Sequence, residues 1–289
     1  MSSADASADA IAWAAGVLGA EVTDAVALAG GLTSTILALT DTSGQRTVLR
    51  LMTEEPWRTH GAELTTRERA AFQALTDTPL PAPRSIALDA AGAATGVAAH
   101  LMTRLPGVPT REAGSGTVSA MAGLLARIHD VVSVAPFRHF QSWAWEAKWV
   151  VPPWTTHPES WQRAFAILAG EPPAYAPTFL HRDFGHRNLL WCGGEISGVV
   201  DWVETSTGPA WLDAAHAATN LAVDFGPEPA RAFLQQYAGL AREAPQQYWL
   251  VMDAVGFLPV PGRQPLFGSP TQLVRLDEWL HDVVVHGVG

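Results

Sequence analysis

The order of the predicted elements constrains the fold of this chain more than any other feature. Short strand-like runs occupy the sequence up to about residue 105, and helical patterns dominate from about residue 116 onward. A cluster of Pro and Gly at residues 105–109 separates the two parts. Strands followed by helices are typical of α+β proteins. We therefore predict a β-rich lobe over residues 1–105 and an α-rich lobe over residues 106–289.

The front part predicts a small sheet with one packed helix. The first residues, to about 30, fit an Ala-rich helix and an entry loop. Strands are predicted at residues 35–40, 46–52, 85–88 and 97–103. A helix is predicted over residues 61–75, where Leu64, Glu68 and Phe72 share a face because they lie four residues apart. Glu68 is therefore a carboxylate on an otherwise apolar helix face.

The second part is mainly helical. Helices are predicted over residues 118–131, 141–149, 158–168, 209–223, 227–240, 244–257 and 271–285. Short strands around turns are predicted at residues 178–180, 188–191 and 196–201. This pattern leaves one region of strands and loops, within residues 178–213, inside an otherwise helical lobe.

That region carries the most informative residues of the chain. His-Arg-Asp stands at residues 181–183, with Asn188 five residues after Asp183, and an apolar Val-Val pair ends on Asp201. A single Asp after a strand is more often a capping residue. The whole set favours a cation site, because Mg²⁺ takes one or two carboxylates and substrate phosphates while keeping several waters. Asp183 would then accept a hydrogen bond from an attacking hydroxyl.

From about residue 30 to about 248, the sequence resembles the aminoglycoside phosphotransferase family, which are small-molecule kinases related to protein kinases. Residues 181–191 are similar to the catalytic loop of that family, and residues 197–202 to its metal-binding strand end. Weaker similarities are Gly208, residues 124–129 (the helix behind the loop), residues 67–75 (the N-lobe helix) and residues 101–107 (the hinge). The resemblance implies a protein-kinase-like two-lobe fold, with ATP or GTP as phosphoryl donor and Mg²⁺ as cofactor.

The resemblance also implies roles for individual residues. Asp183 corresponds to the catalytic base, and Asn188 and Asp201 to the magnesium ligands. Asp213 would brace the catalytic loop from the start of its helix, and His181 would be structural. The loop departs from the family by having Gly-His-Arg at residues 185–187, where His-Pro-Gly is commoner. Arg187 contacting the γ-phosphate and Arg187 pointing to solvent remain open, and His186 is interpreted as a loop residue.

The first lobe of a kinase needs a cation for the nucleotide phosphates, usually Lys. The only Lys of this chain, Lys148, lies in the second lobe, so the candidate is Arg50, with Glu68 as its partner. An exposed Arg–Glu surface pair is the alternative. The other nucleotide-binding candidates come from the phosphate-covering loop and the hinge: Gly31, Ser34, Thr103 and Leu105.

Composition narrows the choice of partners. Hydrophobic residues make up 48% of the chain and charged residues 16%, which excludes a disordered chain. The net charge of −10 argues against a nucleic-acid partner, because nucleic-acid binders present a basic face. Cys192 is the only cysteine, which excludes a disulfide framework; it is interpreted as a buried or half-buried thiol. No basic leader and no apolar run of about 20 residues is found, so we predict a cytoplasmic protein without a membrane partner.

The acceptor site is left open by the sequence. Five Trp ahead of the catalytic loop are predicted to form one cluster, which fits either core packing or an aromatic wall for an acceptor: Trp143, Trp145, Trp149, Trp154 and Trp161. Acidic residues of the last helices fit either a solvated face or contacts to the amines of an acceptor: Asp253, Asp277, Glu278 and Asp282. The solvated face is the preferred interpretation of the last three.

Three functions compete at this point. The first is a kinase for an aminoglycoside-like antibiotic, and the second is a metabolic kinase for choline, a sugar or an amino alcohol. The third is a nucleotide-binding protein without phosphotransfer, against which the intact Asp183, Asn188 and Asp201 argue. The sequence predicts a small-molecule acceptor but neither its identity nor the oligomeric state.

Overall fold

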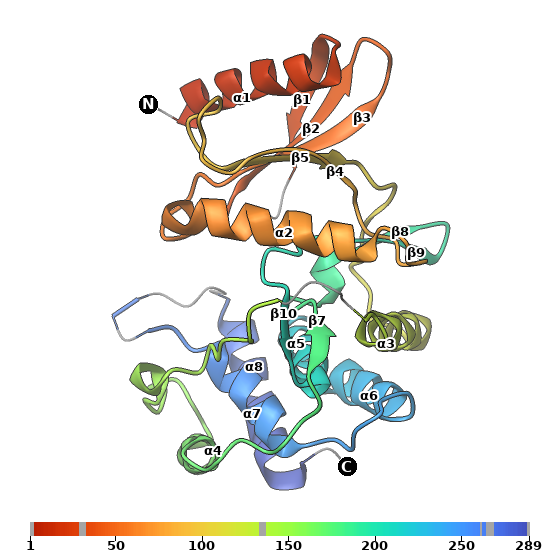
Figure 1. The fold of residues 1–289 in the computed structure, drawn as a ribbon. Helices are drawn as coiled ribbons and strands as arrows, with labels where there is room; N and C mark the ends of the chain where they lie inside the picture. The colour runs from red at the N-terminus through yellow and green to blue at the C-terminus, as the bar shows by residue number, and fades with distance from the viewer. Residues whose placement is uncertain (1–2, 29–32, 133–136, 261, 264–268, 288–289) are drawn as a thin grey trace. The chain divides into compact units, whose positions relative to one another are not determined.

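The chain forms two compact units in a computed structural model that describes residues 3–28, 33–132, 137–260, 262–263 and 269–287. The first unit consists of Met1–Gly107 and Ser197–Glu204, and the second of Val108–Ile196 and Thr205–Gly289. Figure 1 shows a sheet with helices in the first unit and mainly helices in the second. This confirms the predicted α+β class, with a β-rich front part and an α-rich second part.

One segment departs from the predicted lobe boundary. The sequence analysis assigned all of residues 106–289 to the second lobe, whereas Ser197–Glu204 packs with the first unit. The backbone N–H of Val199 donates to the carbonyl of Pro81 at 2.7 Å, and Val203 joins an apolar cluster of the first unit. A single cut along the chain cannot represent a unit that is built from two separated segments.

The first unit is built on a five-stranded antiparallel sheet in the order β1-β2-β3-β5-β4. The strands are β1 (Val22–Ala27), β2 (Thr35–Asp41), β3 (Arg46–Leu51), β4 (Ser85–Asp89) and β5 (Ala99–Thr103). The four predicted strands correspond to β2 to β5. The entry loop was wrong in part, because it contains β1. This edge strand is exposed at all but its first residue, so it lacks the alternating apolar pattern that identifies half-buried strands.

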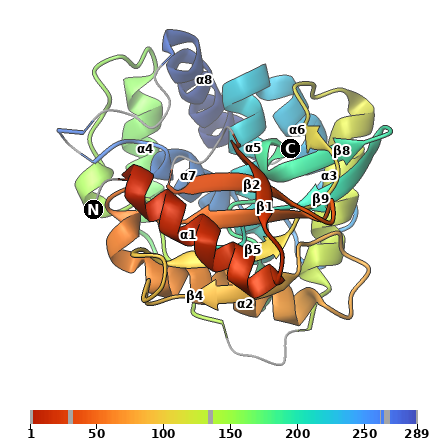
Figure 2. The ribbon, with the colours of Figure 1, turned by 90° about the horizontal axis from the view of Figure 1, so that it is seen from above.

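The two faces of this sheet differ in chemistry. Its helical elements are α1 (Ser3–Leu18), the short 3-10 helix η1 (Trp57–His60) and α2 (Gly61–Leu75). Leu49 and Leu101 pack with Ala14 of α1, which lies across the strands in Figure 2. Successive strand residues point to opposite faces, so Arg50 and His100, which are directly paired in the β3–β5 register, lie on the other face with α2.

The second unit contains six α-helices among the described residues. They are α3 (Ser115–His129), α4 (Pro158–Leu168), α5 (Ala210–Phe225), α6 (Pro227–Ala238), α7 (Gln247–Gly256) and α8 (Pro270–His286). All six were predicted, with shifts of a few residues at their ends. No helix in the described part of the chain is long and apolar enough to cross a membrane.

The helix predicted over residues 141–149 was wrong. Only the short 3-10 helix η2 (Glu146–Lys148) forms there. The Ser142 hydroxyl accepts a hydrogen bond from the backbone N–H of Ala144, a local turn that competes with helix formation. Trp145 has extended backbone angles, so no helix can pass through it. The helical turn η2 therefore begins only at Glu146.

Helix α5 is the centre of the second unit. It contacts α3, α6, α7 and α8, and nearly all of its residues are buried. Pro209 precedes it, and Gly226 ends it with a φ of 99° that favours glycine. Six Ala along the helix let neighbouring helices approach closely. The few polar side chains of α5 are therefore held at fixed positions inside the unit.

Short strands flank the predicted catalytic segment. β7 (Thr178–Leu180) pairs with β10 (Ser206–Gly208), β6 (Val108–Pro109) pairs with β8 (Leu189–Cys192), and η3 (His186–Asn188) and β9 (Glu195–Val199) complete the region. Gly208 is required by close packing, because a Cβ there would lie 2.6 Å from Phe140 and 2.9 Å from Leu180. These pairings fix both ends of the segment that carries Asp183 and Asn188.

Candidate active site

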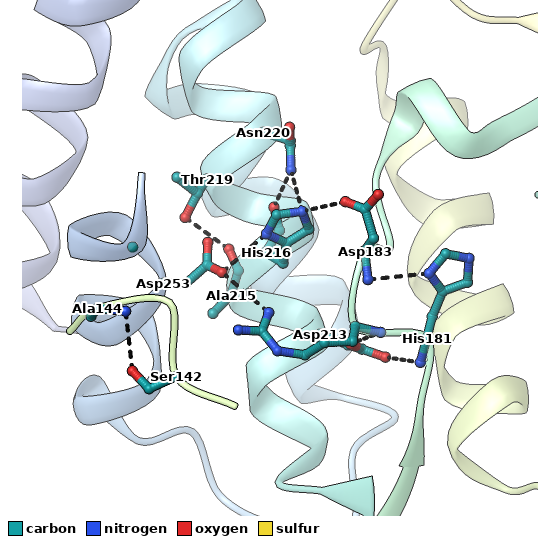
Figure 3. Close-up of polar contacts among 12 residues, drawn as sticks. Ser142, Ala144, His181, Asp183, Asp213, Ala215, His216, Thr219, Asn220 and Asp253 are labelled. Carbon is teal, nitrogen blue, oxygen red and sulfur yellow. Dashed lines mark hydrogen bonds and ion pairs between the residues drawn. The ribbon is translucent and has the colours of Figure 1, made fainter. Parts of the chain in front are cut away.

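The HRD loop, residues 181–188, is fixed at its start by one carboxylate. Asp213, in the first turn of α5, accepts hydrogen bonds from the backbone N–H groups of His181 at 2.8 Å and Arg182 at 2.7 Å. These bonds hold Arg182 at a φ of 72°, which non-glycine residues rarely adopt. Nδ1 of His181 in turn accepts from the backbone N–H of Asp183 (Figure 3). Asp213 and His181 thus make contacts of the kind that loop bracing requires.

The Asp183 carboxylate is held at both oxygens. Its Oδ2 accepts from Nδ2 of Asn188 at 3.0 Å, and its Oδ1 lies 2.9 Å from Nε2 of His216. The side chain remains 36% exposed, so it has both fixed orientation and access to solvent. Burial acts to raise the pKa of Asp183, but the hydrogen bond and charge of His216 outweigh it and lower the pKa below its ordinary value. Asp183 is therefore ionised at neutral pH.

His216 lies between two carboxylates. Its Nδ1 is 3.0 Å from Oδ1 of Asp253, which is buried on α7. Burial opposes the charged form, yet Asp253 and Asp183 together raise the pKa of His216 to about 9. The Arg182 guanidinium, 3.8 Å from Asp253, stacks over the ring of Trp143. The environment of Asp183 thus includes two cations and a second carboxylate.

Sequence reasoning missed His216 and Asn220. His216 lies three residues after Asp213 on α5, and Asn220 lies four residues after His216, so all three lie on one face of the helix. Figure 3 shows this face directed toward the HRD loop. A polar stripe along an otherwise Ala-rich helix was the available signal. It was overlooked because only Asp213 belonged to the pattern that the family resemblance supplied.

In the first unit, Arg50 joins three partners. Its NH2 lies 3.1 Å from Glu68 and 3.0 Å from Asp201, and its NH1 donates to the Ser34 hydroxyl at 3.0 Å. Arg50 and Glu68 are both buried, so the predicted pair forms in the interior, and the exposed alternative was wrong. The contact with Asp201 was not anticipated. A guanidinium can serve several acceptors at once because its donors form a planar fork.

Glu68 is shared between Arg50 and a histidine. Nδ1 of His100 lies 2.8 Å from its second oxygen, and Nε2 of His100 lies 2.9 Å from the Ser85 hydroxyl. Burial acts to raise the pKa of Glu68, but the charge of Arg50 and the bond to His100 prevail and lower it. Phe72, one turn along α2, stacks on the His100 ring. Glu68 is therefore an ionised, fully buried carboxylate.

The remaining predicted nucleotide and metal candidates fall at the edges of their units. Asp201 follows β9 with a φ of 68°, and its side chain is 27% exposed. Thr103 ends β5, where its hydroxyl accepts from the backbone N–H of Arg84, and Leu105 is half-buried two residues later. Gly31 lies outside the described residues. Besides Glu68, Ser34 is the one nucleotide candidate among the described residues that hydrogen-bonds to Arg50.

Arg187 and His186 share one acceptor. Arg187 makes two hydrogen bonds to Asp224, at 2.9 and 2.6 Å, and Nε2 of His186 lies 2.9 Å from the same carboxylate. These bonds outweigh burial and lower the pKa of Asp224 below its ordinary range. The sequence analysis left two alternatives for Arg187, a contact to the γ-phosphate or a side chain in solvent, and neither of them included this bidentate pair with Asp224. His186 is a buried loop residue, as interpreted.

The tryptophans do not form one group. Trp149 and Trp161 both contact the ring of Phe165, and Trp154 packs edge-on against Trp161. Trp145 is 54% exposed, and Trp143 packs edge-on against His216. The single predicted cluster was therefore wrong, because the segment that carries the first three Trp is not helical.

Several residues are more buried, or less buried, than predicted. Asp277 is buried and accepts from the indole N–H of Trp161 at 2.8 Å, and the buried Asp282 pairs with an Arg of α6. The prediction that these acidic residues form a solvated helix face was therefore wrong for Asp277 and Asp282, whereas Glu278 is exposed. Cys192, at the end of β8, is exposed rather than buried. The charged α8 residues were misjudged because their partners come from distant segments.

Solved structures of phosphotransferases share this fold. The aminoglycoside phosphotransferase APH(4)-Ia has a TM-score of 0.67 at 16% identity, with 98% of this chain and 99% of that chain covered. The macrolide 2'-phosphotransferase MphH from Brachybacterium faecium has a TM-score of 0.63 at 17% identity, covering 86% and 91%. The amicoumacin kinase hAmiN, in complex with AMP-PNP, Ca²⁺ and Ami, has a TM-score of 0.59 at 13% identity, covering 90% and 87%. The likeness confirms the kinase-like fold.

The family assignment comes from the sequence. No curated protein matches the chain. The sequence model of the phosphotransferase enzyme family, APH, matches residues 24–248, a span that contains both the Arg50 and the Asp183 clusters. The chain is therefore a member of the APH phosphotransferase enzyme family.

Proposed function

We propose that this phosphotransferase moves the γ-phosphoryl group of ATP or GTP to a hydroxyl of a small molecule, with Asp183 as the base. The observation that carries the proposal is the Asp183 carboxylate, which is ionised, partly exposed and held at both oxygens by Asn188 and His216. A carboxylate in this state can orient an attacking hydroxyl and accept its proton. Asp213 contributes by fixing the loop backbone on which Asp183 stands.

Asn188 and Asp201, which the family resemblance implies as magnesium ligands, are the residues we propose for the ion. Among the described residues there is no group of three or more His, Cys, Asp or Glu that could hold a metal ion. Mg²⁺ needs no such cage, because it uses one or two carboxylates with phosphates and water. The side-chain nitrogen of Asn188 donates to Asp183, so its side-chain oxygen is the atom that would bind the metal. Asp201 would supply a carboxylate ligand. When bound, the ion neutralises phosphate charge.

The nucleotide would be held by the first unit. Arg50 is the phosphate cation, Glu68 fixes it, and Ser34 stands beside it at the end of the phosphate-covering loop. Thr103 and Leu105 are proposed as hinge contacts. We assign nucleotide binding to the first unit, acceptor binding to the second, and a cytoplasmic location, where ATP and GTP are available.

An antibiotic is the proposed acceptor class. The solved structures with this fold include enzymes named for aminoglycosides, macrolides and amicoumacin, which supports a polar natural product. A metabolic alcohol such as choline or a sugar is the second candidate. Protection of a sensitive bacterium expressing the protein, tested against aminoglycosides, macrolides and peptides, separates the two. Lack of protection against all of them would remove the antibiotic assignment.

The reaction itself is tested with purified protein. Incubation with Mg-ATP or Mg-GTP and a library of polar alcohols should yield a product heavier by one phosphoryl group. Asp183→Asn should lower turnover by about 10²–10⁴-fold, because general-base contributions have this size. Asp201→Ala should abolish it. Asp130→Asn, which changes an exposed carboxylate paired with Arg242, is the control and should match the wild type. Full turnover in Asp183→Asn would contradict the proposed base.

A further inference from the structure

The His216 imidazole lies against the carboxylate of Asp183, whereas the nearby His181 ring contacts the backbone N–H of Asp183, and both nitrogens of His216 face carboxylates. Nε2 lies 2.9 Å from Oδ1 of Asp183, and Nδ1 lies 3.0 Å from Oδ1 of Asp253. A neutral imidazole carries one N–H, so it would present a lone pair to one of these carboxylates. An imidazolium donates to both. The geometry is that of a buried cation bridging two anions.

The surroundings define the competing arrangement. Nδ2 of Asn220 lies 3.0 Å from Nε2 of His216 and also donates to the carbonyl of His216. In a neutral ring protonated at Nδ1, Nε2 would accept from Asn220 and repel Asp183. Other groups near the ring are Trp143 and Phe257, whose rings pack against it, and Arg182 and Lys148, whose charges act on Asp253. The two arrangements differ in one proton, which an experiment can locate.

We propose that His216, in its doubly protonated form, is a positioning residue that orients the Asp183 carboxylate for catalysis. The inference deepens the proposed function and rests on Asp183 being the base. Asp253 fixes the ring from behind, and Nε2–H of His216 fixes Oδ1 of Asp183. Because both ring nitrogens already carry protons, His216 takes no proton from the acceptor. It acts through Asp183, whose second oxygen is fixed by Asn188.

The protonation state of His216 is measured directly by ¹⁵N NMR of the histidine rings, with His216→Gln used to assign the signal. We expect both ring nitrogens to be protonated at about pH 7.5, and the ring to become neutral at lower pH in Asp253→Asn than in the wild type. A neutral ring protonated at Nδ1 alone in the wild type would overturn the proposal. This measurement needs no acceptor, so it decides the point even where the proposed reaction is not observed.

Kinetics then test the positioning role. His216→Gln should lower kcat about 30- to 100-fold, while the KM for nucleotide stays within about twofold, because only the orientation of the base changes. In the wild type, kcat should fall as pH rises through about 9, and this limb should be absent in His216→Gln. In Asp253→Asn, kcat should begin to fall at lower pH than in the wild type. A purely structural role of His216 would not produce this shift.

Controls separate the possible failures. His281→Gln removes a histidine that contacts Ser160 and stacks on His157, away from the HRD loop in sequence and in its contacts, and its kcat should equal that of the wild type. Thermal unfolding identifies variants that fail to fold. If His216→Gln does not fold, the positioning role is tested by the pH at which kcat falls in folded Asp253→Asn. An unchanged kcat in folded His216→Gln would overturn the positioning role. By contrast, turnover that survives in Asp183→Asn would reject the proposed base while leaving the NMR result on His216 intact.

Discussion

The two units each bury a cation between carboxylates, but the cations differ in kind. In the first unit Arg50 joins Glu68 and Asp201, and in the second His216 joins Asp183 and Asp253. A guanidinium stays charged at every working pH, whereas an imidazolium can lose its proton. The Arg50 centre is therefore a permanent charge arrangement, and the His216 centre is one that depends on pH.

The largest effect is expected from breaking the Arg50 centre at its buried carboxylate. Glu68→Gln leaves Arg50 in the interior without its fully buried anion, and removal of one partner of a buried pair costs about 3–5 kcal/mol. Urea unfolding should show this loss of unfolding free energy. Glu63→Gln on the same helix removes an exposed partner of Arg67 and should cost less than about 1 kcal/mol. Equal losses in both variants would contradict the comparison.

The next prediction tests the pH dependence of the His216 centre through stability. The pKa of His216 is raised from 6.5 to about 9, so its stabilising contribution is complete below about pH 6.5 and is lost as pH rises to about 9. The difference in unfolding free energy between wild type and His216→Gln should shrink by about 2–3 kcal/mol between about pH 6 and pH 9.5. The cost of Glu68→Gln should change little over that range, because Arg50 keeps its charge. A pH-independent difference for His216→Gln would remove the distinction between the centres.

These two centres also show what the sequence could predict. The β2 to β5 strands and the six helices have clear periodicity. The Arg50–Glu68 pair followed from the family resemblance, the absence of Lys from the first lobe and a carboxylate on an apolar helix face. The edge strand β1 was missed because an exposed strand shows no alternation. The helix at residues 141–149 was wrong because the side chain of Ser142 competes for the backbone.

The rest of the site depends on contacts between residues far apart in the chain. His216 bonds to Asp183, 33 residues away, and to Asp253, 37 residues away. A sequence can place His216 on the same helix face as Asp213, but it cannot state which loop and which helix face that side chain. The Arg50–Asp201 contact was missed for the same reason, since the two residues belong to separated segments of one unit.

Arg50→Lys tests whether the planar fork of Arg50 matters beyond its charge. A single ammonium cannot reproduce contacts made through NH1 to Ser34 and through NH2 to Glu68 and Asp201. We expect the KM for nucleotide to rise about tenfold, which corresponds to about 1.4 kcal/mol. Arg69→Lys, an exposed change on α2, is the control. An unchanged KM would mean that charge alone suffices at this centre.

The smallest effect is expected where the Arg50 centre ends, at Ser85. Its hydroxyl lies 2.9 Å from Nε2 of His100, the ring that holds Glu68 from the other side. A hydroxyl can either donate to the ring or accept from it, whereas the carboxylate of Asp253 beside His216 can only accept. Ser85→Ala should therefore cost only about 1 kcal/mol of unfolding free energy, the value of one neutral hydrogen bond. A loss as large as that of Glu68→Gln, measured by the same urea unfolding, would show that His100 depends on an outer partner as His216 does on Asp253.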